Sequence, residues 1–477
     1  MKKLWVRPVR RVRHVRRLHF SQRERASTFI IVLWIAVGLV SMALYFGHAM
    51  HYELRASDNR VSNQIAEQAI EGAVRYINNL LAYESAYGSN GILPDASSYV
   101  SEAVPVGDAR FWLIGRDTNT LSGQGLLSFG LVDEAAKINL NSAPSNILAA
   151  LVYSIANANQ DLPAAILDWR STNSASTYQS YYSTRSQSYQ TKAGPFETVE
   201  ELRLVYGGDY ETLVGEDANR NGILDVNETD LNHNGQLDPG LVEYLTVYSR
   251  EPNTYSNGVA RVSIRTVVGS SGPVPTLLRN VFGSTRGNAI LQNLGLISLG
   301  GGATQTPVPR TFRSPLEFYL ASRMTADEFA QIANCITLTN GNYIEGRINV
   351  NTASATVLAC LPGFDSAPDV AQSLVTYRET NPDKLGSVAW VIDALGQSTN
   401  SVLATLVRSD CITTQTYQFS ADVAAVGPNG RGYRRVRFVF DTSDGTPKVV
   451  YRQDLTHLGW ALGKELRENL VMAKSTR

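Results

Sequence analysis

The apolar pattern at the start of the chain predicts one long helix. Residues 29–46 form a stretch without a charged side chain, long enough at about 1.5 Å per residue to cross a hydrocarbon core of about 30 Å. Over residues 61–80 the apolar positions recur at steps of three and four, the period of an amphipathic helix. No proline lies between Pro8 and Pro94. We therefore expect a single helix over residues 27–83, apolar all round in its first half and amphipathic in its second.

The C-terminal part shows the alternation of apolar and polar side chains that is typical of strands. Glycine-containing turns separate its segments, which predicts an antiparallel meander, and a final helix is expected over Leu455–Met472. The sequence thus predicts an α+β fold in which a long N-terminal helix packs on an antiparallel sheet. The predicted strands are Phe111–Ile114, Leu126–Val132, Thr413–Val426, Arg431–Phe440 and Lys448–Arg452.

An internal repeat marks the region between the long helix and the final strands. Lys137–Ala149 matches Arg347–Ala359, 210 residues later, with identity or close similarity at most positions. In each copy a short extended segment ends in Asn-Ser or Asn-Thr, whose side-chain oxygen can cap the helix that follows. The second copy continues into the helix stop Leu361–Gly363 and a further apolar helix around Val370–Arg378. This pattern predicts an inserted helical domain with helix–hairpin–helix-like repeats.

Helix–hairpin–helix units allow two interpretations. In one, the backbone amides of the hairpin hold the phosphates of DNA, and in the other the unit is structural or contacts protein partners. The hairpin Pro362–Asp365 ends in an acid, where a phosphate-binding hairpin would favour glycine and lysine. The structural use is therefore favoured, and DNA binding with a steep salt dependence remains the alternative.

The chain has 43 basic and 43 acidic residues, but this balance hides two unlike parts. Residues 1–26 hold ten bases and one acid, which leaves the rest of the chain with a net charge of −9. An acidic body excludes a protein that binds nucleic acid over its general surface. By the positive-inside rule the basic leader predicts a cytoplasmic N-terminus and a body on the other side of the membrane. A cleaved secretory signal is the alternative, but no typical cleavage site follows Phe46.

Two acidic segments in tandem have the spacing of calcium-binding loops. Residues 217–228, called loop one, satisfy D-x-[DN]-x-[DN]-G-x5-E throughout. A hard cation needs six or seven oxygens, and glycine at position 6 allows the turn that gathers them. The predicted ligands of loop one are Asp217, Asn219, Asn221, the Ile223 carbonyl, Asp225 and Glu228.

The pattern restarts at residue 230 to form loop two (230–241), whose position 12 is Leu241 rather than an acid. Its predicted ligands are Asp230, Asn232, Asn234, Gln236, Asp238 and, if it reaches in, Glu243. The two starts are too close for paired EF-hands with flanking helices. A polar turn cluster without a metal is the alternative. We favour one or two structural Ca²⁺ ions, bound in the weak range of about 10⁻⁴–10⁻³ M because loop one brings few formal charges.

The cysteines and the absence of common catalytic motifs indicate which kinds of chemistry the chain could carry out. All three cysteines lie in the predicted exported part, where disulfides can persist. Cys360 lies on an apolar helix and is expected as a buried thiol, so a bridge, if one forms, is expected between Cys335 and Cys411. Only His233 and His457 lie beyond residue 51, and no P-loop, HExxH, GxSxG or CxxC motif occurs. We therefore expect a protein without catalytic activity.

The N-terminal architecture resembles the type IV pilin and pseudopilin class, in which a basic leader is cut off before an apolar helix. Members usually have Gly before the cut and Glu at mature position five. The minor pseudopilin K family of type II secretion systems lacks that Glu and carries an apolar-Leu-Trp run instead. Val32–Trp34 is similar to this run if the cut falls between Ala26 and Ser27, which makes Ile31 the fifth mature residue. Ala26 departs from the usual Gly.

Three further segments are similar to the same family, in the same order: Asp133–Ala135, Asp168–Arg170 and Pro195–Arg203. The similarity extends over residues 27–250 and 312–455. It implies a pilin-like head, cleavage by prepilin peptidase and a structural role for calcium. It also implies a single-pass protein anchored in the lipid of the bacterial inner membrane, with a cytoplasmic N-terminus and a periplasmic C-terminal domain.

The function implied by the resemblance is that of a non-catalytic minor pseudopilin. It would lie at the pseudopilus tip with I- and J-like minor pseudopilins and initiate or cap the filament for protein export, without a nucleic-acid or small-molecule ligand. A helix–hairpin–helix component of DNA uptake is one alternative. A membrane-anchored calcium-binding protein without a pilus role is another.

The predicted organisation has seven segments. Within them, Ser171–Gln190 is expected to be an exposed polar loop and residues 251–311 a flexible Gly/Pro-rich insertion. The segments are a basic prepilin-type leader (1–26), a transmembrane helix (27–52), an amphipathic helix with the first part of the head (53–135), an inserted helical domain with the calcium loops (136–243), a strand region with the insertion (244–311), a second helical region with the helix–hairpin–helix motif (312–410), and a C-terminal β meander with a tail helix (411–477).

Overall fold

A continuous helix, α1 (Gln22–Tyr87), opens the structure, a computed structural model, as the proline-free sequence predicts. Contacts divide the chain into two compact units, Met1–Val61 and Ser62–Arg477. The predicted leader lies outside the described residues up to position 21. The structure describes residues 22–87, 91–116, 127–155, 158–172, 176–226, 228–255, 258–297, 309–364, 369–396 and 401–475.

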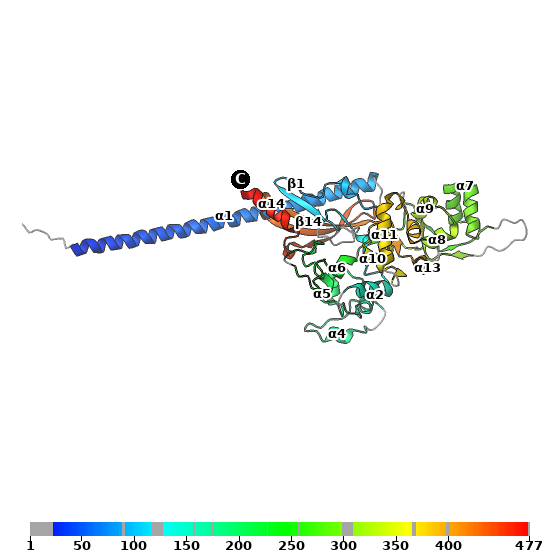
Figure 1. The fold of residues 1–477 in the computed structure, drawn as a ribbon, viewed down its shortest axis with the longest axis horizontal. Helices are drawn as coiled ribbons and strands as arrows, with labels where there is room; N and C mark the ends of the chain where they lie inside the picture. Colours follow the sequence, from blue (N-terminus) through cyan, green and yellow to red (C-terminus); the bar gives the residue numbers. More distant parts are fainter. Residues whose placement is uncertain are drawn as a thin grey trace, which may run out of the picture. The chain divides into compact units, whose positions relative to one another are not determined.

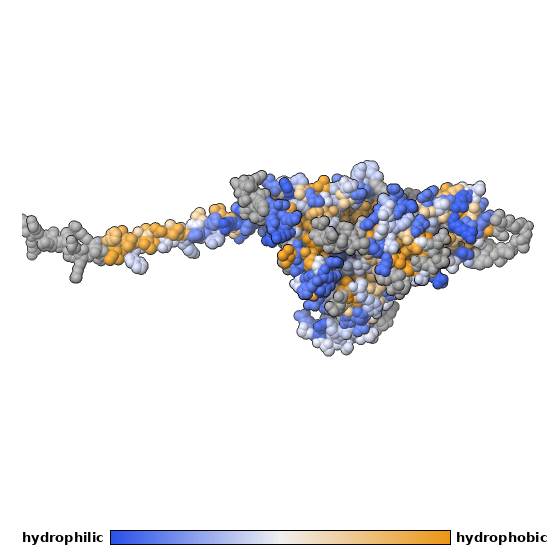
Figure 2. Space-filling view, in the orientation of Figure 1, coloured by the Kyte–Doolittle hydropathy of each residue, from blue (hydrophilic) through white to orange (hydrophobic). Residues whose placement is uncertain are grey.

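The first unit contains the N-terminal part of α1. From Thr28 to Val61 its side chains are exposed all round, and the apolar ones form a continuous band (Figure 2). The most apolar 18-residue window of the helix has a mean hydropathy of 2.5. Among the described residues, α1 is the one helix whose length and composition would allow it to cross a membrane.

The head of the second unit is an antiparallel sheet with the strand order β1-β2-β14-β15-β16, in which β3 pairs with the start of β14. The predicted antiparallel sheet is thus confirmed, although the strand expected over Leu126–Val132 is reduced to β3 and a bridge at Phe129. The strands are β1 (Val104–Val106), β2 (Ala109–Ile114), β3 (Val132–Asp133), β14 (Gln418–Val426), β15 (Tyr433–Asp441) and β16 (Lys448–Asp454).

The C-terminal half of α1 packs on one face of this sheet (Figure 1). Ala69, Ala73 and Ile77 recur at steps of four and are fully buried, which confirms the predicted amphipathic pattern. The β14–β15 turn also touches the helix. A Cβ added to Gly432 would lie 2.4 Å from the carbonyl carbon of Ser62, so this close approach requires glycine.

The rest of the second unit consists of short helices and two-stranded ladders around one large hydrophobic core. The α-helices are α2 (Ser145–Ser154), α3 (Leu162–Arg170), α4 (Gln179–Ser183), α5 (Tyr210–Val214), α6 (Leu241–Tyr244), α7 (Pro273–Asn293), α8 (Pro315–Ser322), α9 (Ala326–Ala333), α10 (Ala355–Ala359), α11 (Asp369–Thr380), α12 (Trp390–Leu395), α13 (Ser401–Leu406) and α14 (Gly463–Ser475). The 3₁₀ helices are η1 (Ala96–Ser98), η2 (Glu134–Ala136), η3 (Val199–Leu204), η5 (Pro382–Lys384), η6 (Pro428–Gly430) and η7 (Thr456–Leu458).

Five ladders connect these helices. Three of them are parallel, and two of these, β4–β5 and β12–β13, begin the two copies of the sequence repeat. The ladders pair β4 (Ile138–Asn139) with β5 (Leu245–Thr246), β6 (Arg250–Pro252) with β11 (Tyr343–Glu345), β7 (Val262–Ser263) with β10 (Ile336–Thr337), β8 (Thr266–Val267) with β9 (Arg310–Thr311), and β12 (Ile348–Asn349) with β13 (Ile412–Thr413).

The first copy of the repeat is held together by an arginine and an asparagine. Arg170, at the end of α3, donates to the carbonyls of Leu140 and Ala143. The side-chain oxygen of Asn139 accepts the backbone amide of Asn141 at 2.8 Å. These bonds fix the turn between β4 and α2.

The second copy repeats these bonds. Arg378 of α11 donates to the carbonyls of Val350 and Ala353, and Asn349 accepts the backbone amide of Asn351 at 3.1 Å. The sequence repeat is therefore also a structural repeat. Helix–hairpin–helix geometry stays a prediction, because Asp365 in the expected hairpin lies outside the described residues.

The expectation of an exposed loop over Ser171–Gln190 is wrong in part. The segment contains α4, and Tyr182 in this helix is fully buried against Trp169, with the ring centroids 5.5 Å apart. The many hydroxyl groups of the segment favour exposure, but tyrosine rings carry enough apolar surface to drive burial.

The insertion over residues 251–311 is also more ordered than expected. It contains α7, whose Leu278 and Ile290 are fully buried and which kinks at Gly283. The composition of the segment concealed a helical spacing of apolar residues at its centre. Residues 298–308 lie outside the described part of the chain.

Candidate metal centre and its contacts with the sheet

Loop one is folded around the carboxylate of its first residue. Asp217 is buried, and its two oxygens accept the backbone amides of Asn221 (2.9 Å) and Gly222 (2.8 Å). Gly222 has a φ of 85°, and a Cβ there would lie 3.1 Å from the Arg116 side chain. Glycine at position 6 is therefore needed for the turn, and the lack of a Cβ leaves room for the Arg116 side chain.

The remaining predicted ligands of loop one gather around Asp225. Its Oδ2 accepts the side-chain amides of Asn219 (2.7 Å) and Asn221 (2.9 Å). The two carboxylate oxygens of Glu228 accept the backbone amides of Asn219 and Asp225, each at 2.9 Å. The structure thus brings the predicted oxygen donors together in one compact turn.

Loop one fits a hard cation in one specific respect. The Oδ1 atom of Asn219 is buried and has no hydrogen-bond partner, an arrangement that is costly unless an electropositive group meets it. Among the described residues no three His, Cys, Asp or Glu side chains converge as a metal site. A cation here would therefore depend on asparagine oxygens and the Ile223 carbonyl as well as on carboxylates.

Loop two repeats the hydrogen bonds of loop one on the surface. Asp230 accepts the backbone amides of Asn234 (3.3 Å) and Gly235 (2.8 Å). Asp238 accepts the side-chain amides of Asn232 and Asn234, as Asp225 does in loop one. Gln236 donates its backbone amide to Asn234 at 2.7 Å.

Loop two has Leu241 at position 12, and the acid that bonds to its backbone precedes loop one in the sequence. Glu216, buried and located just before loop one, accepts the backbone amides of Leu231 (2.6 Å) and Asp238 (3.0 Å). Glu228 makes a similar pair of bonds in loop one, to the amides of positions 3 and 9, whereas those of Glu216 go to positions 2 and 9. Sequence reasoning missed Glu216 because the motif looks for the acid after the loop. A Cβ on Gly215 would lie 2.4 Å from the Asp238 carbonyl, so glycine allows the two segments to meet.

Glu243, the acid proposed from the sequence for loop two, is used elsewhere. Its Oε1 forms an ion pair with Nε of Arg116 at 2.8 Å. Arg116 also donates to the carbonyl of Arg220 at 2.8 Å. The next helix, α6, thus directs Glu243 toward the end of β2, and Glu216 rather than Glu243 bonds to the backbone of loop two.

A buried arginine holds loop one against the sheet. Arg435 of β15 is fully buried and forms a two-pronged ion pair with Asp422 of β14, at 2.8 and 2.5 Å. The same guanidinium donates to the carbonyls of Asn219 and Arg220 in loop one. Burial by itself raises the pKa of Asp422, but the Arg435 charge outweighs it and lowers that pKa. Loop one is thus part of the buried interior, and loop two is not.

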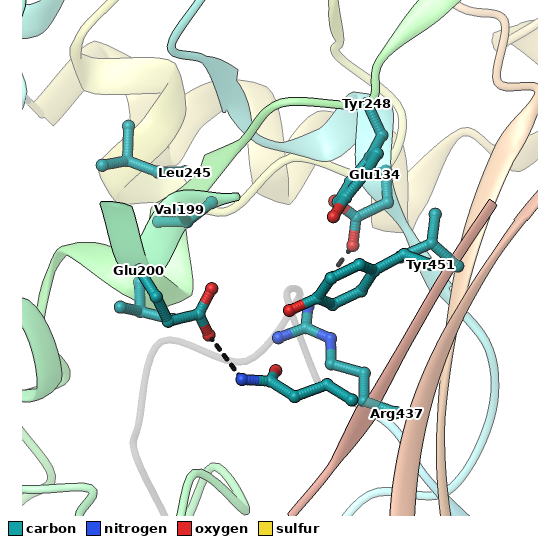
Figure 3. A pocket seen from close by; sticks show the side chains of 10 residues that line it. Glu134, Val199, Glu200, Leu245, Tyr248, Arg437 and Tyr451 are labelled. Atoms are coloured by element: carbon teal, nitrogen blue, oxygen red, sulfur yellow. Dashed lines mark hydrogen bonds and ion pairs between the residues drawn. The ribbon is translucent and has the colours of Figure 1, made fainter. Parts of the chain in front are cut away.

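A second polar contact joins η2 to the sheet. It lies beside a cavity of about 20 Å³, which has room for about one water. Figure 3 shows Glu134 of η2 and Arg437 of β15 pointing toward one another beside the rings of Tyr248 and Tyr451. Burial raises the pKa of Glu134, but the charges of Lys137 and Arg437 outweigh it and bring that pKa to about 2. Glu134 is therefore ionised inside the protein.

All three cysteines are free thiols, so the expected Cys335–Cys411 bridge is not formed. The two residues belong to different ladders. The carbonyl of Cys335 accepts the amide of Val262 beside β10, and that of Cys411 accepts the amide of Ile348 beside β13. Cys360 is buried, as expected.

The predicted processing residues Ala26 and Ser27 lie within α1, where the backbone is already helical. Val32–Trp34 lies one to two turns further along the same helix. Ile31 and the residues of this run have exposed side chains. The structure therefore places the run on the surface of the apolar band.

Comparisons with known proteins bear on residues 348–407. This segment, which begins at β12 and ends just after α13, matches the family model "Type II secretion system (T2SS), protein K". A chain in the crystal structure of the GspK-GspI-GspJ complex from enterotoxigenic Escherichia coli is similar over 84% of this chain and 99% of its own, with 10% sequence identity and a TM-score of 0.39. No curated protein matches the chain. The family match confirms the resemblance, predicted from the sequence, to the type II secretion system protein K family.

Proposed function

We propose that this protein is a non-catalytic minor pseudopilin of a type II secretion system, the K-like subunit. The observation that carries the proposal is the family match over residues 348–407, which include the second copy of the structural repeat. The long apolar α1 and the antiparallel sheet on which its second half packs support it. The protein would be a single-pass protein of the bacterial inner membrane, with the N-terminus in the cytoplasm and the second unit in the periplasm.

The position proposed for the subunit is the tip of the pseudopilus, with I- and J-like minor pseudopilins. Ile31 stands at mature position five, so no carboxylate is available there to pair with the N-terminal amine of a neighbouring subunit. The helical region adds bulk to the pilin-like head. A subunit of this kind would start or cap the filament.

Processing by prepilin peptidase is part of the proposal. The cut would fall between Ala26 and Ser27, removing the leader and its excess of positive charge. N-terminal sequencing of the protein extracted from membranes would then begin at Ser27. An N-terminus at Met1 would contradict the processing step.

Calcium would have a structural role in the second unit. Asp217, Asn219, Asn221, Asp225 and Glu228, with the Ile223 carbonyl, would hold one ion in loop one, which supplies oxygen ligands suited to a hard cation. In loop two, Asp230, Asn232, Asn234, Asp238 and the Gln236 carbonyl would hold a second ion, with Glu216 in place of Glu243. Ions bound in the folded state alone would stabilise the fold.

Deletion of the gene in its own host tests the proposed function. We expect secreted proteins to accumulate in the periplasm of the deletion strain and to be exported again when the full chain is supplied. A chain without residues 1–61 serves as the control, since it lacks the apolar segment and should not restore export. Normal export in the deletion strain would contradict the proposal.

A further inference from the structure

Charge is distributed unevenly along the chain beyond residue 26. Residues 261–323, called the arginine lobe, contain seven arginines, no lysine and one acid, Glu317. The lobe therefore carries a net charge of +6, whereas the rest of the chain beyond residue 26 carries −15. The lobe comprises β7, β8, α7, β9 and α8, and α7 and α8 lie side by side (Figure 1).

Three of the seven arginines are engaged inside the protein. Arg261 is buried and pairs with Glu251 at 3.1 Å. Arg286 forms a two-pronged ion pair with Glu328, with both contacts at 2.7 Å. Arg279 donates to Asn288 and to the carbonyl of Ser270. These arginines have structural roles.

The other four, Arg265, Arg310, Arg313 and Arg323, are exposed and have no carboxylate partner among the described residues. Three of them are gathered by one small ladder. β9 begins at Arg310, which is paired with Val267 of β8, and the amide of Phe312 bonds to the carbonyl of Arg265. Arg265 and Arg310 are therefore diagonal neighbours across the ladder, about 7–8 Å apart, and their like charges repel one another when the protein is free.

Exposed apolar side chains share this lobe. Val268 follows β8, Val281 lies on α7 and Leu320 lies on α8, and all three remain exposed. Arginine with apolar side chains and without lysine is the composition of protein–protein interfaces, in which guanidinium groups pair bidentately with carboxylates. A nucleic acid backbone would pair with the arginines but would leave these exposed apolar side chains without apolar contacts, so a protein fits the lobe better.

We propose that the arginine lobe is a docking surface for an acidic protein partner. Arg265, Arg310, Arg313 and Arg323 would pair with its carboxylates, while Val268 and Leu320 would contact apolar side chains set between them. This inference does not depend on the role in secretion, because it follows from the charge and exposure of the lobe.

Binding of defined probes to the full chain in detergent tests this inference. The main probe is a peptide in which glutamates alternate with leucine and phenylalanine, compared with poly-L-glutamate and with short duplex DNA. We expect the mixed peptide to bind most tightly, and R265Q/R310Q/R313Q to weaken it about tenfold or more, equivalent to about 1.4 kcal/mol. The matched control R75Q/R110Q/R408Q removes three exposed arginines outside the lobe and should change the affinity less than about twofold.

A second variant separates an interface from a general anion site. V268S/L320S keeps every charge and should bring the affinity for the mixed peptide down to that for poly-L-glutamate. Absence of binding by the mixed peptide would overturn the proposal. DNA or poly-L-glutamate binding as tightly as the mixed peptide would also overturn it, since the lobe would then recognise charge alone.

Discussion

Loop one and loop two share one hydrogen-bond pattern but differ in their surroundings. Both place an aspartate under two backbone amides and a second aspartate under two asparagine side chains. Burial raises the pKa of Asp217 in loop one, whereas the backbone amide of Gly235 is the main reason that the pKa of the exposed Asp230 is lowered. The motif therefore sets the local turn, and contact with the sheet decides whether the loop belongs to the folded interior.

The largest effect is expected from replacing Arg435, which holds loop one against the sheet. Arg435→Met would leave Asp422 buried without its partner and release the carbonyls of loop one, at a cost of about 3–5 kcal/mol in the free energy of unfolding. Arg452→Met is the control on the next strand, since its pair with Glu67 is largely exposed and should contribute about 0–1 kcal/mol. Chemical denaturation measures both. Equal losses of stability in the two variants would show that the contact with Arg435 does not distinguish loop one from loop two.

Acid should weaken the other contact between the helical region and the sheet. Because the pKa of Glu134 is lowered to about 2, its ionised form contributes stability above the unfolded pKa of 4.5 that is lost as the pH falls from there through 2. The full loss would be about 3 kcal/mol. Glu134→Gln should flatten this part of the pH profile measured by denaturation. An unchanged profile would show that Glu134 is not the group responsible.

Calcium should stabilise the fold through loop one more than through loop two. At a calcium concentration 100 times the dissociation constant, the gain is about 2.7 kcal/mol when binding requires the folded state. Asp217→Ala should remove most of the calcium-induced rise in melting temperature. Asp230→Ala should leave most of it, because the exposed loop two can open without global unfolding. A larger loss of calcium stabilisation in Asp230→Ala than in Asp217→Ala would contradict this difference between the two loops.

The smallest effect concerns the acid of loop two. Glu216→Gln would lose one of two amide bonds, costing about 1 kcal/mol, and should weaken calcium binding at loop two. Glu243→Gln should leave calcium binding unchanged, because Glu243 pairs with Arg116. Calorimetric titration distinguishes the two variants. Weaker binding in Glu243→Gln alone would restore the assignment made from the sequence.

The sequence predicted features that depend on local periodicity and spacing. The long helix, the antiparallel sheet and the turn around Asp217 follow from patterns within a few residues of each other. The role of Glu216 and the hold of Arg435 on loop one could not be predicted, because each joins segments whose meeting depends on the complete fold. The free Cys335 and Cys411 were missed for the same reason, since sequence alone does not show which ladder each belongs to.

The proposed function requires that this chain assembles as the K-like subunit of a secretion pseudopilus. The most direct test is purification of the tagged full chain from detergent-solubilised membranes of its own host, with its I- and J-like minor pseudopilins produced at natural levels. We predict a complex that contains one copy of each of the three proteins. Isolation of the chain as a monomer without these partners would contradict the proposed function. Specific binding of duplex DNA at low salt in place of those partners would also contradict it.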